Sequence, residues 1–213
     1  CLKCDQITNE GLKSLCDGGI QHLKSLKTLQ LIFDGCQLIS DEGLQSLSCQ
    51  GLKQLQGLTT LHLNFDRCKK ITNKGLKSLC SEGMWHFKEL TRLLLRFNWC
   101  LQITDESFGS TFYEGIQSLK FLTDLQLSFN STQITNLGLN YISCYTLPYL
   151  KYLTTIHLSF SYCKDILGDE ELRNLCEKGT QHLQSLTSLS LIFKYSCQRM
   201  SRFGLESLIS KIT

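Results

Sequence analysis

Cysteine is the residue in this chain with the widest chemical repertoire, because its thiolate can act as a nucleophile or a metal ligand, and two thiols can form a disulfide. The chain of 213 residues contains 12 cysteines. Eleven of them recur at two positions of a repeat: Cys4, Cys36, Cys68, Cys100, Cys163 and Cys197 at the first, and Cys16, Cys49, Cys80, Cys144 and Cys176 at the second, 12 or 13 residues later. Thr132 replaces cysteine once at the first position. A small, weak donor that threonine can replace is typical of a buried ladder bonded to turn carbonyls, so we expect structural thiols.

The opening Cys1-Leu2-Lys3-Cys4 has the spacing of a CxxC redox or zinc motif. The repeat already explains Cys4, and Cys1 falls where the next repeat carries Phe33. We therefore expect no metal site and no cofactor. Neighbouring ladder positions about 5 Å apart would also allow a disulfide. Reduced thiols predict an intracellular, cytoplasmic protein, with cytoskeletal or ciliary association as a further option.

The histidines follow the same periodicity and do not form a separate set. His22, His86 and His182 share one position of the repeat, and His62 and His157 share another. Periodic histidines are typical of scaffold or surface, and the chain has no GxxxxGK, GxSxG or HExxH motif. The sequence therefore predicts no catalytic residues and no enzymatic activity.

One modification signal stands apart from these patterns. Asn130-Ser131-Thr132 is a glycosylation sequon, which would be used only if the protein were secreted.

Composition limits the classes of partner. Hydrophobic residues make up 42% and charged residues 19% of the chain, which is enough to bury a continuous core. The net charge of +3 is small and dispersed, so we expect no nucleic-acid partner. No apolar run approaches the roughly 18 to 20 residues that span a bilayer, so we expect no membrane insertion.

The elements that carry these residues repeat six times. The repeated strand-like runs begin at Leu29, Leu61, Leu93, Leu125, Ile156 and Leu189, in steps of 32, 32, 32, 31 and 33 residues. In one run, Leu61, Leu63 and Phe65 alternate with His62 and Asn64, which predicts a strand with one buried face. A period of this length indicates a solenoid.

Each strand is followed by signals for a helix. Thr72 and Asn73 are typical capping residues, and Leu76 with Leu79 has helical spacing. Gly83 recurs in most repeats and suits either a helix C′ position or a close contact between repeats. Because stacked strands lie about 4.8 Å apart and packed helices about 8 to 10 Å apart, the array must curve with its strands on the concave face.

The phrase Leu61-x-Leu63-x-Phe65-x-x-Cys68-x-x-Ile71-Thr72-Asn73-x-Gly75-Leu76 resembles the leucine-rich repeat in its cysteine-containing and ribonuclease-inhibitor-like forms. With its period of about 32 residues, it is also similar to arrays in ciliated protists. The resemblance covers essentially the whole chain. It implies an α/β horseshoe, with parallel strands inside and helices outside, and most often a protein-binding role. We expect residues 1–213 to form a single leucine-rich-repeat domain of about six and a half repeats, as a fragment of a longer protein without its caps.

Binding residues are expected where a concave strand departs from its small, polar neighbours. The candidates are Arg92, Leu94 and Arg96 on the third strand, Asn98 and Trp99 just beyond it, and Arg67, Tyr162 and Tyr195 at the same repeat position as Trp99. Trp, Tyr and Arg dominate interface hot spots, although the same residues also occur as ordinary surface. Trp85 interrupts a polar column and marks a possible convex contact.

The predicted function is a non-catalytic protein-protein interaction module or scaffold, possessing a concave face that binds another protein. Two alternatives remain open. The array could be the substrate-recognition region of an F-box-type ubiquitin ligase receptor. It could also be the regulatory repeat region of a larger enzyme or GTPase activator. In any of these roles it could form part of a larger assembly.

Overall fold

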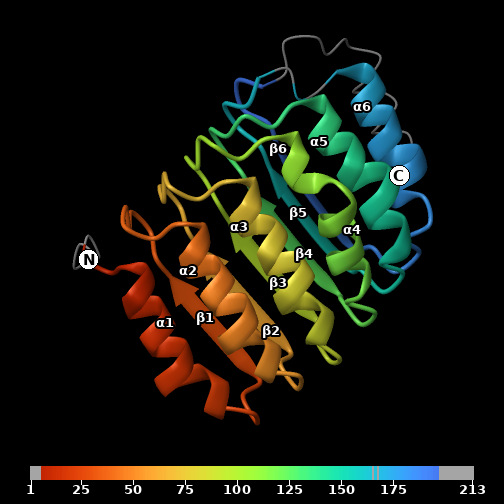
Figure 1. Cartoon of the computed structure of the whole chain (residues 1–213). Coiled ribbons are helices and arrows are strands. Elements are labelled where there is room, and N and C mark those ends of the chain that lie inside the picture. The colour runs from red at the N-terminus through yellow and green to blue at the C-terminus, as the bar shows by residue number, and fades with distance from the viewer. Residues whose placement is uncertain (1–5, 165, 167, 197–213) are drawn as a thin grey trace.

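Six parallel strands form one open sheet in chain order (Figure 1). The computed structural model describes residues 6–164, 166 and 168–196. The strands are β1 (Thr28–Ile32), β2 (Thr60–Asn64), β3 (Arg92–Arg96), β4 (Asp124–Ser128), β5 (Thr155–Ser159) and β6 (Ser188–Ile192). Each strand pairs only with its sequence neighbours, so the sheet grows by one strand per repeat. This order confirms the predicted solenoid.

The strand register keeps equivalent repeat positions side by side. Leu61 of β2 pairs with Leu93 of β3, and Leu63 pairs with Leu95. These leucines are fully buried, whereas the alternating residues between them face the other side of the sheet. A one-residue slip would exchange the two faces, and this difference in burial fixes the register.

A layer of helices covers one side of the sheet (Figure 1). The α-helices are α1 (Asn9–Gly18), α2 (Asp41–Ser46), α3 (Asn73–Ser78), α4 (Ser110–Gln117), α5 (Asn136–Tyr141) and α6 (Asp169–Asn174). Four of them continue into π-helical turns, which are η2 (Leu47–Gly51), η4 (Leu79–Gly83), η7 (Ile142–Thr146) and η9 (Leu175–Thr180). The 3-10 turns are η1 (Ile20–His22), η3 (Leu52–Gln54), η5 (Met84–His86), η6 (Asp105–Phe108) and η8 (Leu147–Tyr149). None of the helices that the structure describes combines the length and apolar character needed to cross a membrane.

The helix starts are fixed by caps that also join neighbouring repeats. The Thr72 hydroxyl accepts from the N–H of Lys74, as predicted for a cap. The carboxylate of Asp41 accepts from the N–H groups of Thr72 and Gly75 in the next repeat, at 2.8 and 3.0 Å. The carboxylate of Asp105 likewise accepts from the N–H of Thr135 in the next repeat, at 2.8 Å. The cap residues therefore set both the helix start and the stacking of repeats.

A column of stacked phenylalanines fills the core behind the strand ends. Its members are Phe33, Phe65, Phe97, Phe129, Phe160 and Phe193, and consecutive ring centroids lie 5.4 to 6.0 Å apart. Each ring buries a large apolar area against both neighbours. Successive repeats therefore share one hydrophobic core, and isolated repeats would lose it.

The first cysteine position forms the predicted ladder. The thiols of Cys68 and Cys100 each donate to the phenylalanine carbonyl of the preceding repeat, at 3.2 Å. Cys163 donates to the Phe129 carbonyl at 3.2 Å, and the Ser196 hydroxyl makes the equivalent bond to Phe160 at 2.8 Å. Serine can thus replace cysteine here, which confirms a structural hydrogen-bonding role.

The assignment of Cys197 to this ladder was wrong, because Ser196 occupies that position in the sixth repeat. Cys197 itself, like Cys1 and Cys4, falls outside the described residues.

The second cysteine position divides into two. Cys16 and Cys80 are fully buried in the helical layer, but Cys49 and Cys144 lie one residue further on and are only partly buried. Ser48 and Ser143 occupy the corresponding buried position and are fully buried. The expectation of one cysteine position was therefore wrong. Cys49 follows the buried Leu47 by two residues, whereas Cys80 follows the buried Leu79 directly, and the extra residue turns the side chain to another face of the helix.

Local geometry decides between the two expectations for the recurring glycine. A Cβ on Gly115 would lie 2.8 Å from the Cys80 carbonyl oxygen, so this position serves close contact between repeats. Gly83 has φ −88° and is not a left-handed C′ residue. Pro148 lies in the first turn of η8, where no backbone donor is needed.

Candidate functional site

The third residue after the end of each strand has a left-handed backbone. The φ angles are 77° at Gly35, 62° at Arg67, 62° at Trp99, 57° at Ser131, 60° at Tyr162 and 58° at Tyr195. We call these six residues the positive-φ column. A non-glycine residue in this conformation costs roughly 1 to 2 kcal/mol. Five of the six repeats therefore carry a side chain where glycine would be more stable.

Hydrogen bonds between repeats impose this conformation. The N–H of Arg67 donates to the Asn98 carbonyl at 2.7 Å, and the N–H of Trp99 donates to the Asn130 carbonyl at 2.8 Å. Tyr162 makes the equivalent bond to Lys194 at 2.8 Å. The backbone of the column is therefore fixed at strand-like spacing, whichever side chain it carries.

The large side chains of the column are exposed. Trp99 is 49% exposed, Tyr162 57% and Tyr195 77%. The rings of Tyr162 and Tyr195 stack, with centroids 4.9 Å apart. Ser131 lies between Trp99 and Tyr162 in the column, is only 8% exposed, and lines the same groove as both.

In the four middle repeats, the residue before the column member belongs to a second, largely buried row. We call Asp66, Asn98, Asn130 and Ser161 the acceptor ladder. The Oδ1 of Asp66 accepts from the Asn98 N–H at 2.8 Å, and the Oδ1 of Asn98 accepts from the Asn130 N–H at 2.7 Å. The Oδ1 of Asn130 accepts from the Ser161 N–H at 2.6 Å. The Oγ of Ser161 accepts from the Lys194 N–H at 3.1 Å. These bonds satisfy the polar side chains of Asp66 and Asn98, which are only 6% and 7% exposed.

This ladder changes the interpretation of two residues. Asn98 was predicted as a binding residue, and the structure commits its side-chain oxygen to Asn130 and Ser128. The sequon residue Asn130 is similarly occupied, because its Nδ2 donates to Ser128 and its Oδ1 accepts from Ser159. A glycan on that nitrogen would replace one of its two hydrogens and would have to fit beside the Ser128 hydroxyl. The recurrence of Asp and Asn at this position was the sequence signal for it.

The concave arginines each pair with an aspartate of an adjacent repeat. Arg96 contacts Asp66 through Nη2 at 2.7 Å and Nε at 3.1 Å. Arg67 contacts Asp34 at 3.2 Å. Each guanidinium retains substantial exposure, so it can still contact a partner from the side away from its aspartate.

The third arginine pair has the same design. Arg92 contacts Asp124 at 2.9 Å, and its side chain is 58% exposed.

Most of the predicted residues line one open groove of about 560 Å³. Its lining includes Arg67, Arg96, Asn98, Trp99, Ser131, Tyr162 and Lys194, together with Asp34, Asp66, Asn130, Ser159, Ser161 and Ile192. Tyr195 adjoins it through the stack on Tyr162. Arg92 and Leu94 lie earlier along β3 and do not line it. The groove crosses the strand ends of several repeats.

Leu94 instead neighbours a half-buried histidine. His62 of β2 pairs in register with Leu94, and its Nε2 is buried without a hydrogen-bond partner among the described residues. Burial lowers the pKa of His62, the charge of Arg96 lowers it further, and Asp66 partly opposes both. A neutral imidazole beside leucine fits a scaffold role.

Trp85 is half-exposed on η5, away from the groove. It lines a depression of about 400 Å³ with Phe121. Tyr141, Tyr145 and Tyr149 of the helical layer are also exposed, as is Tyr152 in the turn after η8. Trp85 therefore shares a surface depression with Phe121, a residue that the sequence did not single out.

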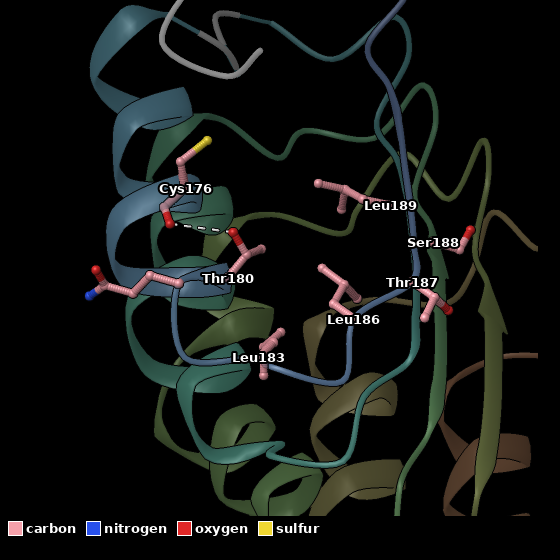
Figure 2. A pocket seen from close by; sticks show the side chains of 8 residues that line it. Cys176, Thr180, Leu183, Leu186, Thr187, Ser188 and Leu189 are labelled. Atoms are coloured by element: carbon pink, nitrogen blue, oxygen red, sulfur yellow. Dashed lines mark hydrogen bonds between the residues drawn. The ribbon is translucent and has the colours of Figure 1, made fainter. Parts of the chain in front are cut away.

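A further cavity, of about 530 Å³, lies between η9 and β6 (Figure 2). Leu183, Leu186 and Leu189 point into it, and the Thr180 hydroxyl donates to the Cys176 carbonyl at 3.3 Å. The corresponding leucines of the second repeat, which are fully buried, are Leu55, Leu58 and Leu61. The cavity is thus the interior of a repeat at the end of the described array, lined by packing residues.

The thiols are not arranged for chemistry. Burial raises the pKa of Cys16 to about 11 and that of Cys68 to about 12. Such thiols stay protonated near neutral pH and are weak nucleophiles. Among the described residues, no group of three or more His, Cys, Asp or Glu could hold a metal ion.

Comparisons with known proteins agree with this architecture. A family model described as leucine rich repeat matches residues 21–48 and 57–80. No curated protein matches the chain.

Among solved structures, an internalin (inlF) from Listeria monocytogenes shares 20% identity over 89% of this chain, with a TM-score of 0.46, and the chain spans 47% of its length. The Rad7 and Elc1 complex from yeast gives 18% identity over 98% of this chain and 65% of that one, with a TM-score of 0.43. An internalin C2 from Listeria monocytogenes gives 21% identity over 95% of this chain and 80% of that one, with a TM-score of 0.43. The matched repeats, the parallel sheet in chain order and the helices on one side of it identify the fold as a leucine-rich-repeat solenoid.

Proposed function

We propose that this protein is a non-catalytic interaction module that binds another protein along the groove at its strand ends. The observation that carries the proposal is the positive-φ column. Trp99, Tyr162 and Tyr195 are large, exposed side chains at backbone positions where glycine would be more stable. Aromatic side chains that lower stability and are exposed to solvent are best explained by a role in binding a partner protein.

The chemistry of the groove suits a protein surface. Trp, Tyr and Arg combine large buried area with directional hydrogen bonds, and they dominate interface hot spots. The arginines are held by aspartates, so their side chains lose less entropy when a partner binds. The acceptor ladder and the phenylalanine stack keep the groove rigid.

We further infer that the repeats are of the cysteine-containing type and that the protein works in a reducing, intracellular compartment. The bonds from Cys68 and Cys100 to phenylalanine carbonyls support this inference, because they require thiols.

Affinity capture followed by quantitative mass spectrometry tests the binding role. The bait is the chain itself, as wild type, as the double variant Trp99→Gly with Tyr162→Gly, and as the control Trp85→Gln. Glutamine is the residue at the Trp85 position in other repeats, such as Gln21 and Gln117. We expect at least one protein captured by the wild type and the control to fall about tenfold with the double variant. If the double variant captures the same proteins in the same amounts as the wild type, the groove is not the binding site.

A further inference from the structure

We propose that the groove takes a proline-rich segment in the polyproline II conformation, lying along the solenoid axis with an acidic residue at the Lys194 end. This inference rests on the proposed function and specifies its partner. It follows from the spacing of the aromatic side chains, from an unpartnered serine between them, and from the charge of the groove.

The spacing comes from the stacked strands. Trp99 and Tyr162 belong to alternate repeats of the positive-φ column, and Ser131 lies between them. Two strand spacings place their backbones about 9.6 Å apart. One turn of polyproline II has three residues and rises about 9.3 Å. A polyproline II segment crossing the strands would therefore present equivalent residues to Trp99 and to Tyr162.

An extended β-segment along the same path would fit less well. Its side chains repeat about every 6.7 Å on one face, which matches neither one nor two strand spacings. The backbone groups of the described repeats already bond to their neighbours across the groove floor, as at Trp99 and Asn130. Strand addition across them is therefore excluded, and recognition must use side chains. Rows of aromatic side chains are how proline-rich segments are commonly recognised.

Ser131 supplies an independent observation. Its Oγ is buried, lines the groove and has no hydrogen-bond partner among the described residues. Buried hydroxyls are nearly always paired, so an unpaired one needs an explanation. Polyproline II has no internal hydrogen bonds, so its carbonyls are available. A segment seated between Trp99 and Tyr162 would bring a carbonyl to the Ser131 hydroxyl.

Charge sets the direction of the segment. Arg67 and Arg96 are matched by Asp34 and Asp66, so Lys194 gives the groove one excess positive charge. Lys194 adjoins the Tyr162–Tyr195 stack at one end of the aromatic row. An acidic residue that follows the last proline would meet this charge.

Fluorescence anisotropy with a labelled peptide tests the proposal. The probe carries proline at every third position, followed by two glutamates. Control peptides replace every proline by alanine or both glutamates by lysine. We expect the probe to bind the wild type at least about tenfold more tightly than either control, and to lose about tenfold in affinity with Trp99→Gly or Tyr162→Gly. Equal binding of the alanine peptide would overturn the proposal.

Two serine variants separate recognition from general effects on the fold. Ser131 and Ser143 each have a buried, unpartnered hydroxyl, but only Ser131 lines the groove. We expect Ser131→Ala to weaken peptide binding about fivefold or more, with unfolding midpoints close to wild type, and Ser143→Ala to bind normally. Equal binding by both variants would count against the hydrogen bond from Ser131.

The result also distinguishes the two proposals. If Trp99→Gly loses captured proteins while no proline-rich peptide binds, the polyproline assignment fails and the interaction module stands. If capture is insensitive to the double variant, the interaction module itself fails.

Discussion

The acceptor ladder and the positive-φ column are adjacent in sequence and opposite in character. Asn98 is almost completely buried, whereas its neighbour Trp99 is half-exposed. The ladder joins repeats through side chains, so its members are limited to acceptors such as Asp, Asn and Ser. The column joins repeats through backbone N–H groups, so its side chains are unconstrained and range from glycine to tryptophan. Side-chain identity can therefore vary at positions where backbone hydrogen bonds alone join neighbouring repeats.

Removing a ladder acceptor should have the largest effect. Asp66→Ala leaves the buried N–H of Asn98 without its acceptor and Arg96 without its partner. We expect the free energy of unfolding to fall by about 2 to 3 kcal/mol, measured by urea denaturation.

Asp34→Ala is the matched control for this change. Asp34 forms a salt bridge with Arg67, and both side chains are about half-exposed. Asp34→Ala should lower the free energy of unfolding by less than about 1 kcal/mol. Equal losses at the two positions would contradict the distinction between ladder and surface.

The thiol ladder should make stability sensitive to alkaline pH. The Cys68 pKa is about 12 in the folded state, against about 8.5 in an unfolded chain. Its contribution is fully present below pH 8.5 and is lost as the pH rises toward 12, since only the unfolded state releases the proton. The free energy of unfolding should fall by about 1.4 kcal/mol for each pH unit above 8.5 from this thiol.

Urea denaturation of the wild type and Cys68→Ser between pH 8 and 10 measures this effect. Serine can donate to the same carbonyl, as Ser196 does in its own repeat, but it does not ionise in this range. The variant should therefore show a shallower decline. Parallel declines would mean that Cys68 ionises equally in both states.

The smallest effect, opposite in sign, is expected in the column. Trp99→Gly relieves the left-handed backbone, and the flexibility of glycine in the unfolded chain offsets part of this gain. We expect unfolding free energy to stay the same or rise by about 0.5 to 1 kcal/mol while partner binding is lost. Trp99→Ala keeps the positive φ and should show no such gain. A destabilised Trp99→Gly would show that the ring contributes to the fold.

Short-range patterns in the sequence predicted most of the fold. The alternation of Leu61, Leu63 and Phe65 gave the strand and its buried face, and the constant period gave the register of the sheet. Both follow from one physical requirement, that every repeat places its apolar side chains against those of its neighbours. The thiol ladder was predictable for the same reason.

Contacts between repeats decided what a single repeat does not encode. Whether Asn98 faces a partner or bonds Asn130 depends on a backbone N–H 32 residues away. The positive φ of Trp99 depends on its bond to the next repeat. Cys49 and Cys80 were assigned to one repeat position, and the packed helices separate them. The amino-acid pattern thus determined which residues are buried in the apolar core, because burial has a simple period. The hydrogen-bonding role of each polar residue was decided by tertiary structure, because the distances between stacked repeats select its partner.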